Sequence, residues 1–134
     1  MIARRLMTIP GVGPITATAI AALAPPVETF TKGRDFAAWL GLAPRQLSSG
    51  GKQKLGSITK MGERTLRRLL IIGCSAVVLQ ASKRGAPAGS WLEQMMARKP
   101  RMLVTVALAN KTARIIWALL IKQEEYKAPV AAAA

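Results

Sequence analysis

The chain has 134 residues, with 20 Lys and Arg against 6 Asp and Glu, which gives a formal net charge of +14 at pH 7 and a pI near 11.4. This length accommodates one domain. A charge of this size indicates a polyanionic partner, with nucleic acid favoured and an anionic membrane surface as the alternative. Half of the residues are hydrophobic (51%) but only 4% are aromatic, so we expect an aliphatic core and an all-α fold.

Several chemistries are excluded by the residues that are absent. The sequence contains no histidine and a single cysteine, Cys74, so it has no Ser-His-Asp triad and no internal disulfide. Its six carboxylates are scattered along the chain, which argues against a metal centre built by this chain alone. We therefore expect no metal ligands and no cofactor here. The apolar run at 69–79 is shorter than the roughly 18–20 residues of a membrane-spanning helix, and no signal peptide is evident, so we expect a cytoplasmic protein without a membrane partner.

The first element in chain order is a glycine turn, Ile9-Pro10-Gly11-Val12-Gly13, ahead of a helix predicted over about 15–23. The string hydrophobic–Pro–Gly–hydrophobic–Gly before a helix is the core of a helix-hairpin-helix motif, which we place at about residues 6–24. We expect Gly11 and Gly13 to adopt positive φ and to let a DNA phosphate approach the free N–H groups of the helix. The alternative is a plain turn between two packed helices.

A short helix over about 33–40 is followed by a glycine-rich basic segment, predicted to be an ordered loop at about 42–62. Ser48 and Ser49 precede a Gly-Gly pair in it. A hydroxyl among cations is a candidate nucleophile for a phosphodiester, with the cations stabilising the transition state. The alternative is a loop that only contacts phosphates. Seven positive residues and one negative residue, Glu63, occupy positions 45–68, and the positive ones are the predicted DNA contacts: Arg45, Lys52, Lys54, Lys60, Arg64, Arg67 and Arg68.

The helical remainder is predicted over 63–126. A long helix over about 63–81 is apolar all round in its second half, which is typical of a buried helix. Ser90 and Glu93 form a capping box that opens a helix ending near 98, and the last helix covers about 102–124. The domain is expected to span 1–128, followed by a disordered Ala-rich tail at 129–134.

Taken together, these strings resemble the C-terminal domain of bridge-RNA-guided serine transposases of insertion sequences, the one-ten and eleven-eleven group. The resemblance covers nearly everything from Leu6 to about Tyr126, and the serine segment with its glycine-rich sequel is its most specific part. The matching strings are Ile9-Pro10-Gly11-Val12-Gly13-Pro14, Gly41-Leu42-Ala43-Pro44-Arg45, Ser48-Ser49-Gly50-Gly51-Lys52, Gly56-Ser57-Ile58-Thr59-Lys60-Met61-Gly62, Leu66-Arg67-Arg68-Leu69-Leu70 and Ala113-Arg114-Ile115-Ile116-Trp117-Ala118-Leu119-Leu120.

The resemblance implies a recombinase that excises and inserts a mobile element. In this family a RuvC-like N-terminal domain binds Mg²⁺ through acidic residues, and a C-terminal serine attacks the scissile phosphate to form a phosphoserine link to DNA. The serine that corresponds here is Ser49, with Ser48 as the fallback. Structured guide RNA and a homo-oligomeric assembly are the further implied partners. Because the RuvC-like domain is absent from this sequence, we expect the chain alone to bind DNA without cleaving it. The alternative is a non-catalytic helix-hairpin-helix DNA-binding module or an inactive transposase remnant.

Overall fold

The computed structural model describes residues 2–42, 44–49, 52–58, 63–86 and 88–126, with side chains described at 3–42, 63–86 and 88–126. Most of these residues are helical. The elements in chain order are α1 (Ile2–Leu6), α2 (Pro14–Leu23), the 3₁₀ helix η1 (Val27–Thr29), α3 (Gly33–Trp39), β1 (Pro44–Ser49), β2 (Lys52–Ile58), α4 (Arg64–Arg84), α5 (Trp91–Arg98) and α6 (Arg101–Lys122).

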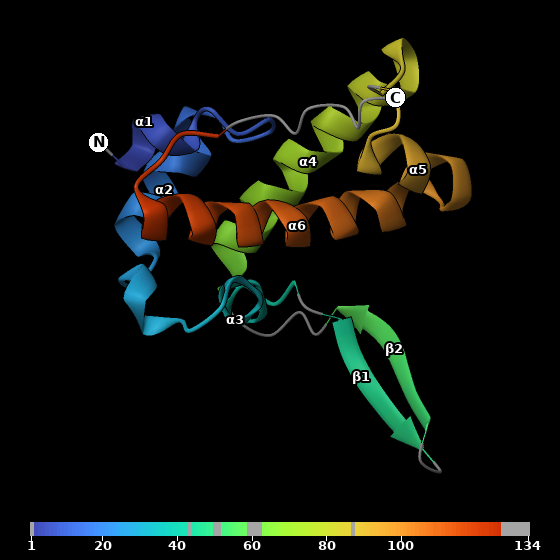
Figure 1. Ribbon diagram of the computed structural model, residues 1–134, viewed down its shortest axis with the longest axis horizontal. Coiled ribbons are helices and arrows are strands. Elements are labelled where there is room, and N and C mark those ends of the chain that lie inside the picture. The colour runs from blue at the N-terminus through green and yellow to red at the C-terminus, as the bar shows by residue number, and fades with distance from the viewer. Residues whose placement is uncertain (1, 43, 50–51, 59–62, 87, 127–134) are drawn as a thin grey trace.

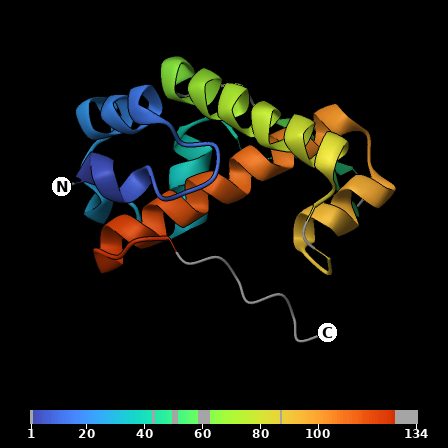
Figure 2. The same ribbon diagram turned by 90° about the horizontal axis from the view of Figure 1, so that it is seen from above.

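The helices form one packed body around α6, which runs along the length of the molecule (Figure 1). Helix α4 crosses α6, while α1 and α2 lie at one end of the body and α5 at the other (Figures 1 and 2). Strands β1 and β2 form an antiparallel hairpin that projects away from the helices next to α3 (Figure 1). The all-α prediction is therefore confirmed for the packed body. The predicted loop at 42–62 is corrected, since two paired strands occupy most of it.

The two long helices, α4 and α6, each contribute one stripe of buried residues to the core. In α4 the buried residues recur every fourth position, at Leu66, Leu70, Cys74 and Val78, as expected for a helix that covers a core on one side. The prediction that its second half is buried all round is wrong, because Ile72 is 56% exposed and Leu79 is 42% exposed. In α6 the buried residues also recur at helical spacing, and they are Val104, Thr105, Ala109, Thr112, Ala113, Ile116 and Leu119.

The core is aliphatic, as predicted, apart from one aromatic cluster beneath α6. Phe36 is fully buried and has its ring centroid 5.3 Å from Phe30 and 6.0 Å from Trp39. Trp117 of α6 donates its indole N–H to the carbonyl oxygens of Val27 and Phe30, each at 3.2 Å. These contacts fix η1 and α3 against α6, and α3 leads directly into the hairpin.

Side-chain caps set the starts of two helices. The Glu63 carboxylate accepts a hydrogen bond from the Leu66 N–H at 2.7 Å at the start of α4. One half of the predicted capping box is present at α5, where the Ser90 hydroxyl accepts from the Glu93 N–H at 3.2 Å. The Glu93 carboxylate accepts from the Gly89 N–H at 3.1 Å, one residue before the N-cap. Both caps satisfy N–H groups that have no partner within the helix.

Two helices, α4 and α6, are long and apolar enough to cross a membrane by length and composition alone. This differs from the expectation drawn from the short apolar run at 69–79. In each helix, part of the apolar segment is buried inside the protein body. The core helices of soluble proteins have the same length and composition. Hydropathy is therefore the same for a membrane-spanning helix and for a buried core helix. The packing of α4 on α6 accounts for the buried apolar stripe of each helix.

Candidate nucleic-acid interface

The glycine turn joins α1 to α2 and is anchored by two buried apolar residues. The Ile9 N–H donates to the Leu6 carbonyl and the Val12 N–H to the Ile9 carbonyl, each at 3.1 Å, and both side chains are buried. Gly11 has φ +87°, which favours glycine. The expectation of positive φ at Gly13 is wrong, because this residue is the extended N-cap of α2 with φ −93°.

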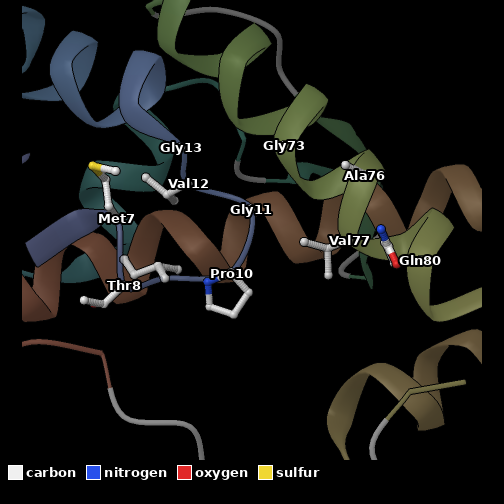
Figure 3. Close-up of a pocket in the computed structure, with 11 residues that line it drawn as sticks. Met7, Thr8, Pro10, Gly11, Val12, Gly13, Gly73, Ala76, Val77 and Gln80 are labelled. Carbon is white, nitrogen blue, oxygen red and sulfur yellow. The ribbon is translucent and has the colours of Figure 1, made fainter. Parts of the chain in front are cut away.

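The turn is seated directly on α4, where Gly11 meets Gly73 (Figure 3). A Cβ on Gly73 would overlap the Gly11 carbonyl oxygen, and a Cβ on Gly11 would lie 3.1 Å from the Gly73 oxygen. Two backbones approach this closely only when neither residue has a side chain. Gly11 therefore serves packing against α4, whereas a Cβ on Gly13 would meet nothing within 4 Å.

A shallow groove of about 540 Å³ runs between the turn and α4 (Figure 3). None of its eleven lining residues carries a charge. The start of α2 next to it has no side-chain cap, which leaves the first backbone N–H groups of that helix as the donors that an anion could reach. A phosphate at the turn would accordingly be held by backbone and helix dipole, without a salt bridge.

The serine segment lies at the far end of the hairpin (Figure 1). Ser49 and Lys52 are the last cross-strand pair, and Ser48 pairs with Gln53. Because paired residues share one face and neighbouring residues alternate between faces, Ser49 and Lys52 occupy one face and Ser48 the other. The register thus separates the two candidate serines.

The other predicted hairpin cations fall along the same ribbon. Lys54 pairs with Leu47, which places it on the face of Ser49 and Lys52. Arg45 lies at the irregularity in register between Pro44 and Gln46. Lys60 lies outside the residues that the structure describes.

The three arginines at the start of α4 form a separate group. Arg64 and Arg68 are exposed and Arg67 is half-buried. The Nη1 nitrogen of Arg67 is buried and has no hydrogen-bond partner among the residues that the structure describes, and a buried donor left unpaired costs about 1–3 kcal/mol, or more when it is charged. At about 100° per residue, Arg64 lies on the opposite side of α4 from Gly73. The structure therefore does not bring the arginines and the glycine turn onto one surface.

One cationic group was missed by the sequence reasoning. The Lys111 ammonium of α6 lies 4.5 Å from the centre of the Trp91 ring of α5, and Arg114 lines the same pocket. This contact depends on the packing of α5 on α6, so no local sequence motif predicts the Lys111–Trp91 pair. Within the described ranges, no group of three or more Cys, Asp or Glu is placed to hold a metal ion.

The helical body and its hairpin correspond to a domain of insertion-sequence transposases. Residues 3–88 match the model of the Transposase IS116/IS110/IS902 family, and the chain belongs to this family. The match includes the glycine turn, the hairpin and α4.

The chain is similar to three longer relatives over 92% of its own length. It is 49% identical to a probable family 20 transposase of Pseudomonas aeruginosa and 45% identical to a putative transposase of Sinorhizobium fredii. It is 41% identical to the transposase for insertion sequence element IS1111A of Coxiella burnetii. The aligned part covers 37%, 32% and 34% of these relatives, so the chain spans about a third of their length.

Proposed function

We propose that this chain is the DNA-contacting C-terminal part of an insertion-sequence transposase, and that it carries the serine nucleophile for strand exchange. Membership of the transposase family supports the reaction class. The observation that carries the assignment of the serine is the hairpin register, which pairs Ser49 with Lys52 at the last position before Gly50-Gly51. A nucleophile at the end of a projecting ribbon can enter a DNA groove while the helical body remains outside.

The chemical step conserves the number of phosphodiester bonds. The Ser49 hydroxyl loses its proton to a base and its oxygen forms a bond to phosphorus. The bond from phosphorus to a deoxyribose oxygen breaks, and that oxygen leaves as a hydroxyl after gaining a proton, so one proton is lost and one is gained. Lys52 and Lys54 share the face of Ser49 and are suited to stabilise the negative charge that develops on the phosphoryl oxygens. No external energy source is needed, because one ester replaces another.

Activation of the serine requires a group beyond those found here. A hydroxyl becomes a good nucleophile when a base or metal assists loss of its proton, and Lys and Arg stay protonated near neutral pH. The chain has no histidine. The Mg²⁺ implied by the family resemblance does not fit the described carboxylates, which form no cluster. We therefore assign metal chemistry to the acidic domain of the complete transposase, and binding and nucleophile to this chain.

Non-covalent DNA binding is assigned to three places: the hairpin, the arginines of α4 and the start of α2. Guide RNA would bind through the same phosphate chemistry, and the family resemblance supports both this RNA and a homo-oligomeric active site. Fluorescence anisotropy with the 134-residue chain should show binding to duplex DNA that weakens about 10³-fold between 50 and 200 mM salt, the lower end for 6–10 phosphate contacts. No binding in low salt, or binding insensitive to salt, would contradict the assignment.

The nucleophile is tested in the complete transposase with Mg²⁺ and its RNA. A denaturing gel should reveal a covalent protein–DNA species that Ser49→Ala abolishes and Ser48→Ala only reduces, since the two residues occupy opposite faces of the hairpin. The 134-residue chain alone should give no such species. An adduct that survives Ser49→Ala and disappears in Ser48→Ala would move the nucleophile by one residue. An adduct absent from the unsubstituted transposase would favour a non-catalytic DNA-binding module.

A further inference from the structure

A further cationic site lies between α5 and α6, on helices to which no DNA contact is assigned above. The pocket has a volume of about 330 Å³ and is lined by Trp91, Lys111, Arg114, Ile115 and Ala118. None of these residues lines the groove at the glycine turn. Four of them follow the three- and four-residue spacing of one face of α6, and Trp91, the first residue of α5, closes the pocket from the other helix.

The Trp91 ring holds the Lys111 ammonium in place. The nitrogen lies 4.5 Å from the ring centre, within the range of a cation–π interaction. Lys111 is half-buried. Burial lowers the pKa of its ammonium, and the positive charge of Arg114 lowers it further. No carboxylate is among the groups that act on this pKa. Lys111 is thus partly desolvated, and the exposed Arg114 lies one helical turn away, so an anion bound between them would relieve their repulsion.

A third segment brings more positive charge to the same part of α6. Gly33 packs on the backbone of Arg114, since a Cβ on Gly33 would lie 3.3 Å from the Arg114 Cα. The residues on either side, Lys32 and Arg34, are exposed. The nearest acid on α5, Glu93, is engaged by the Gly89 N–H at 3.1 Å. The cations of these segments, Lys32, Arg34, Lys111 and Arg114, outnumber the two acids, Asp35 of α3 and Glu93 of α5.

We propose that Lys111 and Arg114, with Trp91 packed against the Lys111 ammonium, form an additional phosphate-binding site for a nucleic-acid strand. Trp91, Ile115 and Ala118 supply an apolar wall on which a sugar or base can rest, while the two cations bind adjacent phosphates. Cations combined with an aromatic wall are typical of nucleic-acid channels. This site rests on the proposed DNA-binding function and extends it, because it adds an interface on α5 and α6 to those on α2, α4 and the hairpin.

An acidic peptide is the competing ligand class, and the pocket favours nucleic acid over it. The chain has a net charge of +14, which matches a long polyanion of regular charge spacing. The aromatic wall offers base or sugar stacking, for which a run of Asp and Glu has no counterpart.

The site is tested by a charge-matched pair of double variants of the 134-residue chain. Lys111→Gln with Arg114→Gln removes the pocket cations, and Lys83→Gln with Arg84→Gln removes two exposed cations from the last turn of α4. Binding of duplex DNA, single-stranded DNA and RNA of equal length is measured by anisotropy across a salt series. The pocket variant should lower the slope of log affinity against log salt by about 2, one for each lost phosphate contact. The control should change the slope by less than half as much.

The result separates failure of this proposal from failure of the proposed function. Equal slopes in the two double variants would overturn the pocket, while DNA binding by the unsubstituted chain would still stand. Absence of binding by the unsubstituted chain in low salt would remove the proposed function itself. The most affected of the three nucleic acids identifies the strand that this site binds.

A second measurement observes the pocket directly and needs no charge substitution. The indole N–H signal of Trp91 in an NMR spectrum, assigned with Trp91→Phe, should shift during titration with an oligonucleotide. Polyglutamate of equal charge should leave it in place. An oligonucleotide that leaves this signal unmoved, or polyglutamate that shifts it equally, would overturn the proposal.

Discussion

The glycine turn and the serine hairpin are the two most distinctive strings in the sequence, and the fold uses them in opposite ways. The turn is pressed onto α4, with Gly11 against Gly73 and Ile9 and Val12 in the core. The hairpin projects from the body and pairs its strands mainly with each other (Figure 1). Glycine in the first string permits close packing, whereas the second string forms a hairpin outside the packed body, where we propose that it contacts DNA. A sequence motif alone therefore does not show whether a segment stabilises the fold or takes part in function.

This comparison predicts that substitutions in the body change the free energy of unfolding and that substitutions in the hairpin change only function. The largest effect is expected for Phe36→Ala, because Phe36 is fully buried and contacts both Phe30 and Trp39. Truncation of a buried Phe costs about 3–5 kcal/mol, a large fraction of the stability of a small domain. Urea unfolding followed by circular dichroism measures it. A loss below about 1 kcal/mol would mean that the site beneath α6 is loosely packed.

The sequence predicted four of the helices closely because each of them has strong local signals. The predicted ranges 15–23, 33–40, 91–98 and 102–124 lie within one or two residues of α2, α3, α5 and α6. Their ends are marked by Pro14, Gly41, Ser90 and Pro100, residues whose effect on the backbone is local. The hairpin was missed because its polar strands lack a hydrophobic alternation, so no buried face identified them as strands.

Long-range contacts could not be predicted from the sequence for a different reason. The seating of Gly11 on Gly73 and the position of Lys111 over Trp91 join residues far apart in the chain. Neither follows from spacing, since both depend on how α4 and α5 pack. The expected positive φ at Gly13 failed because one left-handed glycine, Gly11, is enough to turn the chain into α2.

The second prediction concerns Gly73→Ala, for which helix propensity and packing disagree. Alanine in a helix interior is favoured over glycine by up to about 1 kcal/mol. Here a Cβ would overlap the Gly11 carbonyl oxygen, so we expect a net loss of about 1–3 kcal/mol from overpacking. Cys74 reports the change: burial raises the pKa of its thiol, which should make it unreactive in the native chain. Alkylation should be faster in Gly73→Ala. Gly13→Ala, with open space at its Cβ, is the matched control.

A smaller effect is expected at the start of α4, where the body meets the hairpin. Glu63→Ala removes the carboxylate that accepts from the Leu66 N–H at 2.7 Å, and loss of an N-cap acceptor costs about 1 kcal/mol. Glu63→Gln keeps an acceptor oxygen and should recover most of the loss. Thermal unfolding of the two variants measures the difference. Equal destabilisation by Ala and Gln would show that the negative charge, through the helix dipole, contributes more than the hydrogen bond.

The smallest effect on stability is expected for Ser49→Ala, and this makes it the sharpest test of the comparison. Ser49 lies at the end of β1. Among the described residues, β1 pairs only with β2, and the two strands form a two-stranded sheet. Because the hairpin projects from the helical body (Figure 1), we expect the free energy of unfolding to change by less than about 0.5 kcal/mol. The same substitution should abolish the covalent adduct in the complete transposase. Ser48→Ala serves as the control, since it makes an identical chemical change on the other face of the ribbon. A loss of stability in Ser49→Ala comparable to that in Gly73→Ala would show that the hairpin is part of the folded core, and the division between the two regions would fail.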